Sequence, residues 1–568
     1  MRSVLRFDQI QGNITPGLRK SYQAFILLRL PAREAAGTWL KALVPSVTST
    51  KEVRDFVVWL KQSNRSDVEI AAEHTRWVNV AVSWAGLARL GAPGVEAFPD
   101  DFRQGLRQRA PQVNDEKIED WEVGGTPDSE ADVLLILAAD TEADLNAEIG
   151  HQREQASRHG LTELVTYCGA ELGGKLRGHE HFGYRDGLSQ PDKEVPGVAP
   201  AWGEFVLGHP NQAGELPPGP NWARNGSYAV FRRLKQDVAG FRSVVAAQAD
   251  KTNGALTPEV LGAKLVGRYP SGAKLGEPGT EGQAPSPWAG DDAARVTRFD
   301  FERDPTGEQT PHFAHIRKSN PRDPEARRHR LIRRGIPFGP ALPPGVDDDG
   351  EERGLLFLAY QASLSNQFEH VQRNWLNNAK FPAPQTGRDP LVGQPGGANE
   401  LILRLRGGQG QSTSQVPIML GQFVTMTGGG YFFSPSIDAL TQLAKVATRE
   451  ATTMADDNCR LGEFILKEDP YKWKALGLGG RPLPPDFNAS AHVKRTGMGV
   501  HHDANDPFDF EYTPDDPQYW EGGLFWNLGD TTVRISKAVR IEYEYPGEDG
   551  KPIRKGLVIG FEGSGGGD

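Results

Sequence analysis

The spacing of apolar and polar residues alternates between two periods in the first part of the chain. Apolar runs of strand length lie at 23–30, 76–82, 132–138 and 162–168. Helical patterns lie at 33–43, 53–60, 84–90 and 142–159. Strand, helix, strand is thus followed by strand, helix, strand. This order predicts the ferredoxin-like plan, in which helices cover one face of an antiparallel sheet.

A similar order recurs further along the chain. The elements expected there are a strand from Tyr228, helices at 238–247 and 258–265, a buried strand at 354–362 and an amphipathic helix at 365–376. Because this order repeats that of the first part, the pattern predicts an α+β protein with two similar units, 1–225 and 226–447.

The character of the chain changes at about residue 448. The segment 448–568 is rich in aromatic residues and ends in a strand pattern at 538–545, a turn, and a returning strand at 553–561. Two such runs around a Pro-Gly turn predict a β-hairpin. We therefore expect a β-containing C-terminal extension. Its role is left open between a cap over a substrate channel, an oligomerisation element and a partner-docking module.

Composition narrows the possible functions. The 568 residues carry a formal net charge of −10, which argues against nucleic-acid binding, although the basic run 327–334 leaves local anion binding open. The chain contains no apolar run of about 18 residues, so its sequence predicts no membrane-spanning helix. The N-terminus lacks the hydrophobic core of a signal peptide, so we expect a cytoplasmic protein, with secretion by another route left open.

Cys168 and Cys459 are the only cysteines, and we expect two free thiols, a single bridge being the alternative.

Asp186 lies between two glycines in the stretch 181–191, HFGYRDGLSQP. Glycines on both sides let the backbone turn sharply and approach another group closely. This arrangement suits a carboxylate directed into a crowded cavity. An ordinary Asp-Gly turn is the alternative interpretation.

His315 and Arg333 are two further candidates. His315 has an apolar flank and cationic neighbours in the stretch 312–322, so its imidazole could ligate a metal. The alternative is a structural histidine. Arg333 precedes Arg334 and a Gly-rich turn, so a guanidinium could be presented to a cavity, whereas a solvated basic face is the alternative.

Taken together, these stretches resemble the dye-decolourising peroxidases, a family of haem enzymes. FGYRDGLSQP matches the family's Gly-x-x-Asp-Gly signature, AHIRKSNPR matches the segment with the proximal haem ligand, and RRGIPFG matches the segment with the distal arginine. Weaker matches in family order include DQIQGNI, WVNVAVSWAGLARLG, GRDPLVGQ and GGGYFFSPSI. The resemblance covers about residues 8 to 445 and is closest to the long, fungal-type and related bacterial branch.

The resemblance implies two ferredoxin-like halves, with haem b held mainly by the second half. It implies that His315 is the proximal iron ligand, Asp186 the distal acid–base and Arg333 the distal arginine. Asp389, in GRDPLVG, is the implied hydrogen-bond partner of His315. The implied reaction reduces hydrogen peroxide and oxidises dyes, phenols and similar aromatic donors in one-electron steps.

Other positions receive roles from the same resemblance. Arg317 is expected to contact a haem propionate, and Leu355 with Phe357 is expected to line the distal cavity. Because bulky dyes do not fit a small cavity, electrons should enter through a surface aromatic residue. Trp375 is the candidate, with a core tryptophan as the alternative. Phe338 stands where family members often have tyrosine, which puts another electron route in doubt.

Two rival interpretations keep part of this picture. A haem-binding or haem-handling protein would bind the same cofactor with little turnover, but a carrier needs neither Asp186 nor Arg333. A cargo protein of a compartment would use the C-terminal extension as its address. One local departure from the family is Met426-Thr427, which stands where Pro-Arg is usual.

Overall fold

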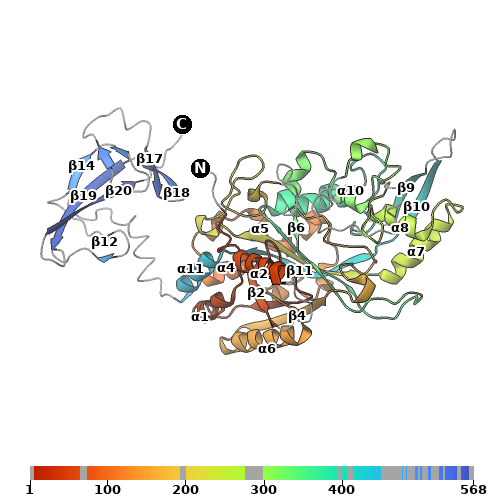
Figure 1. Ribbon diagram of the computed structural model, residues 1–568, viewed down its shortest axis with the longest axis horizontal. Coiled ribbons are helices and arrows are strands. Elements are labelled where there is room, and N and C mark those ends of the chain that lie inside the picture. The colour runs from red at the N-terminus through yellow and green to blue at the C-terminus, as the bar shows by residue number, and fades with distance from the viewer. Residues whose placement is uncertain are drawn as a thin grey trace. The chain divides into compact units, whose positions relative to one another are not determined.

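The computed structural model describes residues 5–63, 73–191, 200–275, 299–394, 398–405 and 414–448, together with the strands between 476 and 561. Residues 5–448 form one compact unit, and a second, C-terminal unit begins at residue 449. In Figure 1 the larger unit is a sheet with helices packed around it. The candidate residues named above all lie in this larger unit.

The first half of the larger unit has the strand order of a ferredoxin-like fold. Its strands are β1 (Tyr22–Arg29), β2 (Arg76–Val82), β3 (Val133–Ala139) and β4 (Thr162–Ala170). Its helices include α1 (Arg33–Leu43), α2 (Thr50–Ser63), α4 (Trp84–Leu90), α5 (Asp100–Arg109) and α6 (Glu142–Arg158). The antiparallel order β4-β1-β3-β2 confirms the predicted plan.

The second half repeats this order. Its strands are β5 (Ser227–Gln236), β6 (Ile332–Arg333), β7 (Ile336–Phe338), β8 (Gly354–Gln361) and β11 (Val424–Ser434). Its helices include α7 (Val238–Asp250), α8 (Pro258–Val266) and α11 (Ile437–Ala447). The order β11-β5-β8-β6 corresponds strand for strand to the first half, which confirms the predicted duplication.

The two halves share one nine-stranded sheet in the described part of the chain. They are joined where β2 meets β11, with Val82 opposite Phe433. At its other end β4 lies against β7, since a Cβ on Gly169 would be 2.5 Å from Ile336 Cγ2. The sheet therefore curves so that its outer parts approach each other.

Alternate residues of β3 contribute to two cores, because successive side chains of a strand point to opposite faces. Leu135 packs with Trp39 of α1 on the helix-covered face. Ile136 belongs to a second cluster with Phe25 and Phe231, whose rings stack with centroids 5.1 Å apart. Burial on both faces explains why β3 reads as an unbroken apolar run.

Further elements position the candidate site. They are α10 (His315–Ser319), η12 (Leu364–Glu369), η13 (Val371–Leu376), and a hairpin of β9 (Asn399–Leu405) with β10 (Ser414–Leu420). The pattern predicts one amphipathic α-helix over 365–376, whereas η12 and η13 are π-helical turns. Phe368 and Val371 are buried as expected. Hydrophobic spacing alone does not reveal the wider turn.

The hydrophobic pattern does not predict β11, because Gly428, Gly429 and Gly430 interrupt it. The structure shows why glycine is present: a Cβ on Gly429 would lie 2.2 Å from the backbone oxygen of Phe231. The register with β5 shifts between Met426 and Gly428. The local departure from the family at Met426-Thr427 therefore falls on a β-bulge.

In the C-terminal unit, β14 (Val493–Thr496), β19 (Lys537–Pro546) and β20 (Pro552–Phe561) form an antiparallel sheet in that order. The pair β19–β20 confirms the predicted hairpin. Shorter pairs are β12 (Leu476–Gly477) with β13 (Arg481–Pro482), β15 (Gly499–His501) with β16 (Phe510–Tyr512), and β17 (Leu524–Leu528) with β18 (Thr531–Ile535).

Two further expectations concern the cysteines and membrane-spanning helices. Cys168 on β4 is an exposed free cysteine among the described residues. Cys459 lies outside them, so the expectation of two free thiols stays a prediction. None of the described helices combines the length and apolar character needed to cross a bilayer.

Candidate active site

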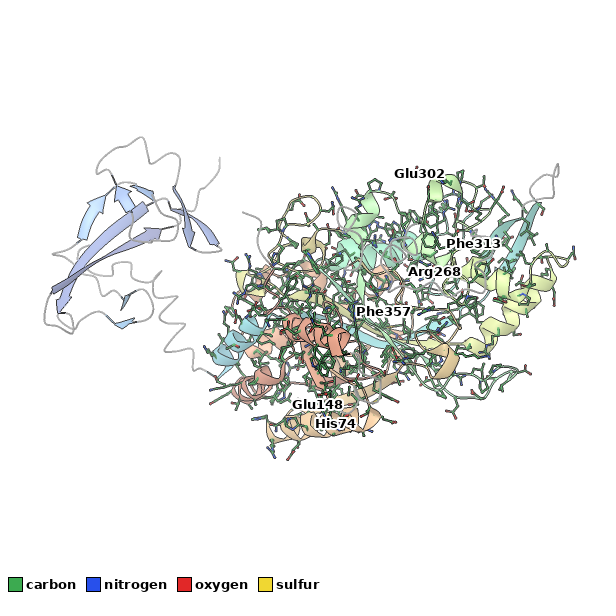
Figure 2. The ribbon with its side chains drawn as sticks, in the orientation of Figure 1. His74, Glu148, Arg268, Glu302, Phe313 and Phe357 are labelled. Carbon is green, nitrogen blue, oxygen red and sulfur yellow. The ribbon has the colours of Figure 1, made fainter. Side chains whose placement is uncertain are left out.

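A cavity of about 300 Å³ is lined mainly by the second half of the larger unit and by one loop of the first half, and it has the size of a small-molecule site. Its walls come from the loop 180–189, from β5 and β8, from α10, and from η12 and η13. Phe357 on β8 and Arg268 after α8, both labelled in Figure 2, line it. Segments far apart in the sequence therefore meet at one site.

His315 is the first residue of α10 and lines the cavity. Its Nδ1 lies 2.9 Å from Asp389 Oδ2, so Nε2 is the ring nitrogen that remains for a ligand. Asp389 is buried, and its Oδ1 accepts hydrogen bonds from the backbone N–H groups of Leu391 and Val392, both at 2.9 Å. The structure thus brings together the two residues that the resemblance paired.

Burial opposes the charged form of each partner in the His315–Asp389 pair, but their mutual attraction outweighs it. The pKa of His315 is raised above its ordinary value by the carboxylate. The pKa of Asp389 is lowered by the imidazole and by the loop N–H groups. Arg333 opposes protonation of His315 and Asp186 favours it, so both of these charges act on the imidazole.

Asp186 lines the same cavity on a turn shaped by glycine. Its backbone N–H donates to Gly178 O at 2.9 Å, and Gly187 N–H donates to Asp186 Oδ1 at 2.6 Å. Gly183 and Gly187 have φ values of 94° and 70°, which favour glycine. The flanking glycines of the sequence therefore form the turn that brings this carboxylate to the cavity.

Arg333 ends β6, lines the cavity and is tied to the Asp186 loop. Its Nη2 donates to Ser189 O at 2.7 Å. Gln190 bonds the backbone of Arg333 twice: Arg333 N–H donates to Gln190 Oε1 at 3.2 Å, and Gln190 Nε2 donates to Arg333 O at 2.9 Å. Gln190 therefore takes the place of a neighbouring strand. The carboxylate and the guanidinium belong to one connected substructure.

Arg322 and Arg330 add positive charge to the cavity wall. Burial, together with the nearby Arg333, lowers the pKa of each to about 10. Arg322 Nε is buried with no hydrogen-bond partner within the described ranges. Because buried cations need an anionic or hydrogen-bonding partner, this wall suits a ligand that carries carboxylates.

This set of donors fits haem. His315 offers one imidazole nitrogen to an iron, and Asp389 fixes the orientation of the ring, as is usual for metal-binding histidines. Arg322 and Arg330 are suited to the two propionates, because guanidinium groups pair with carboxylates. The apolar part of the wall includes Leu355 and Phe357.

Arg317 does not line the cavity, so its expected contact with a propionate gains no support here and stays a prediction. Its Nη1 donates to Asp304 O at 2.9 Å and to Thr310 O at 2.8 Å. The guanidinium also lies 4.7 Å from the centre of the Phe301 ring. Residues two apart on a helix do not share a face, and Arg317 consequently points away from His315 to support the segment before α10.

Trp375 is buried, with 6% of its surface exposed, so the expected surface position is wrong and the core alternative is correct. Its ring stacks on Phe381, with centroids 5.6 Å apart and planes inclined by 8°. It also contacts the rings of His329 and His370 edge-on. His329 lines the cavity, so Trp375 adjoins the site from inside the protein.

Several residues of the site were not singled out by sequence. Glu180, Arg322 and Arg330 line the cavity, and Gln190 supports it. The basic run 327–334 indicated that an anion could be held nearby. Glu180 and Gln190 gave no signal, because polar residues beside a turn are common and their partners lie far away in the sequence.

Comparison with known proteins identifies the family. The model for the DyP dimeric alpha+beta barrel domain matches residues 9–171, and that for the C-terminal part of Dyp-type peroxidases matches residues 180–382. Peroxidase 2 of Mycetinis scorodonius is 30% identical over 471 residues, which cover 78% of this chain and 88% of the relative. The multifunctional dye peroxidase DyP2 of an Amycolatopsis species is 32% identical over 407 residues, 65% of this chain and 82% of the relative.

A solved structure agrees with these matches. The fungal DyP-type peroxidase from Auricularia auricula-judae superimposes with a TM-score of 0.64 at 27% identity, over 78% of this chain and 100% of that one. The fold and the matching sequences define a haem peroxidase. The chain belongs to the Dyp-type peroxidase family.

Proposed function

We propose that this peroxidase reduces hydrogen peroxide and oxidises dyes and similar aromatic donors by one-electron steps, with Asp186 and Arg333 acting on the peroxide. One observation carries this proposal: a single cavity is lined by His315, whose Nδ1 is hydrogen-bonded to Asp389 outside the cavity wall, and by both Asp186 and Arg333. The names of relatives that match most of the chain support the donor class.

His315 would hold the haem iron through Nε2, while its Nδ1–H donates to Asp389. Haem supplies the iron at which peroxide is reduced and the oxidising equivalents that the donors consume. The Asp389 carboxylate fixes the imidazole tautomer and makes the ring a stronger electron donor. Arg322 and Arg330 would bind the propionates.

Asp186 would serve as the acid–base group. Its carboxyl group would accept a proton from one oxygen of hydrogen peroxide and return it to the other oxygen, which leaves as water. Gly187 N–H occupies Oδ1, which leaves Oδ2 for the substrate.

Arg333 would stabilise the charge that develops on the departing oxygen. A cation held in place before the reaction needs no reorganisation, and its effect is strong in a cavity of low dielectric. The bonds from Ser189 and Gln190 provide this fixed position. Asp186 would therefore transfer the proton, and Arg333 would stabilise the developing charge.

Replacing the acid–base group tests this assignment. In Asp186→Asn the rate of reaction with peroxide should fall roughly 10²- to 10⁴-fold, while the haem content stays the same, because Asp186 does not hold the cofactor. Stopped-flow mixing with peroxide gives the rate, and the Soret absorbance gives the haem content. Asp128→Asn, at an exposed position outside the cavity, is the matched control. An unchanged rate in Asp186→Asn would refute the assignment.

The haem-handling alternative is less well supported. The relatives that match over most of the chain carry the names of peroxidases, and the Asp186–Arg333 pair would have no task in a carrier. Steady-state oxidation of a dye with peroxide separates the two functions.

A further inference from the structure

A second carboxyl, that of Glu180, lines the cavity together with Asp186. Glu180 begins the turn that leads to Asp186, and its N–H donates to Tyr184 O at 3.0 Å. Its carboxyl folds back over the same turn, where Oε2 accepts from Phe182 N–H at 2.8 Å and Oε1 accepts from Tyr184 N–H at 3.0 Å. A third donor, Gln236 Nε2 on β5, reaches Oε2 at 2.8 Å. The carboxyl is thus held firmly at the edge of the site.

All three of these donors are neutral amides. The buried carboxylates Asp115 and Asp389 are paired with Arg232 and His315, whereas no cationic side chain of the described residues makes an ion pair with Glu180. A carboxyl without a cation favours its protonated form when it leaves water. Burial accordingly raises the pKa of Glu180 to about 7, against the three hydrogen bonds and with a small contribution from the charge of Asp186.

Gln236 has a feature that suits a carboxyl of changing protonation. Its Oε1 is buried without a hydrogen-bond partner among the residues that the structure describes. Rotation of the amide would let this oxygen accept a hydrogen bond from a protonated Glu180, whereas the present orientation donates to the carboxylate. Either state of Glu180 therefore finds a partner in Gln236.

The charged groups of the surrounding elements are distributed around the cavity. They are Asp186 and Arg185 on the loop, Arg232 on β5, Arg268 after α8, His315 on α10, Arg322, His329 and Arg330 between α10 and β6, and Arg333 on β6. Of these, Asp186 raises the pKa of Glu180. The charge of Asp186 therefore favours the protonated form of Glu180.

We propose that Glu180 is a second acid of the cavity, which delivers protons to the space where Asp186 acts. Reduction of one hydrogen peroxide to two waters consumes two electrons and two protons. Aromatic donors supply the electrons, but the protons must reach an enclosed site. Glu180 releases its proton there and is reprotonated from solvent, so that it gains and loses none over the cycle. This inference rests on the role proposed above for Asp186.

The expected pH dependence follows directly. Below about pH 7 Glu180 is protonated and can donate, whereas above it the residue is ionised and adds a second negative charge beside Asp186. The rate of peroxide reduction should therefore fall as the pH rises through about 7.

The first test compares haem-loaded wild type with Glu180→Gln and with Glu204→Gln. Glutamine keeps the size of the side chain but carries no titrating proton. Glu204 is a matched control, because burial also raises its pKa and it lies outside the cavity. In stopped-flow measurements with peroxide, wild type and Glu204→Gln should lose rate between about pH 6 and pH 8, while Glu180→Gln should be slower by about tenfold or more at pH 5.5 and lack this decline.

A second measurement needs no turnover. Infrared difference spectra between acidic and alkaline solution should show a protonated-carboxyl band that disappears near pH 7 in wild type and in Asp186→Asn, and is missing in Glu180→Gln. Should Glu180→Gln not fold, Gln236→Leu serves instead: it removes one donor to the ionised form and should move the midpoint to higher pH.

Each outcome decides the inference. It is overturned if wild type has no such band, or if the band belongs to Glu180 but the pH decline persists in Glu180→Gln. Because Asp186→Asn tests the proposed function independently of the band, failure of that function and failure of this inference are distinguishable.

Discussion

Asp389 shows how strongly a single buried side chain determines the chemistry of the site. It stays ionised because His315 and two backbone N–H groups compensate for its burial. In Asp389→Asn one amide atom can accept from the imidazole, but the NH₂ group then faces the N–H groups of Leu391 and Val392. We expect haem affinity or the rate with peroxide to fall about 10- to 100-fold, as measured by haem titration and stopped-flow, with Asp128→Asn as the control. Wild-type values for both would show that Asp389 does not tune His315.

At the scale of elements, the two-residue strand β6 depends on a side chain for its outer neighbour. Gln190 satisfies the outward N–H and C=O of Arg333. Gln190→Leu leaves the N–H unpaired and the C=O with only the 3.3 Å bond from Arg334 Nη1, and should lower the free energy of unfolding by about 1–3 kcal/mol. Because Arg333 is also displaced, kcat/KM for peroxide should fall roughly ten- to hundredfold, while KM for the reducing donor stays the same. Urea unfolding and steady-state kinetics measure these effects, and Gln415→Leu, on an exposed strand position, is the control. Equal loss toward both substrates would contradict a role in placing Arg333.

At the scale of the whole molecule, the site and both cores lie within residues 5–448. A chain that ends at Thr448 should therefore fold, bind haem and react with peroxide as the full chain does. Oligomerisation through the C-terminal extension is a prediction, and in that case the shortened chain should have a smaller assembly size. The Soret absorbance per chain and light scattering measure both properties. Loss of haem binding would show that the C-terminal unit contributes to the site.

The sequence predicts an element well when a single physical signal defines it. The strand β3 is visible because both of its faces are buried, and α4 is visible because Gly91 ends it in a left-handed conformation. The strand β11 is hidden because close approach to β5 requires glycine in place of apolar residues. The local sequence pattern shows that glycine occurs at a position, but it does not show which distant segment packs there and requires it.

The same limit applies to the candidate site. His315, Asp186 and Arg333 could be placed because each lies in a distinctive stretch, and the cavity contains all three. Arg317 could not, because its direction is set by carbonyl groups of the preceding segment. The contact between Glu180 and Gln236 depends on how a loop meets β5, which spacing along the chain does not determine.

The position of β11 between β2 and β5 has a consequence for biosynthesis. The strands β2 and β5, which flank β11 in the sheet, both leave the ribosome before β11 does. Until then the edges of β2 and β5 are unpaired and open to association with other chains, and the pocket lacks Val424 from its wall. The pocket is therefore complete only when nearly all of the larger unit has been translated.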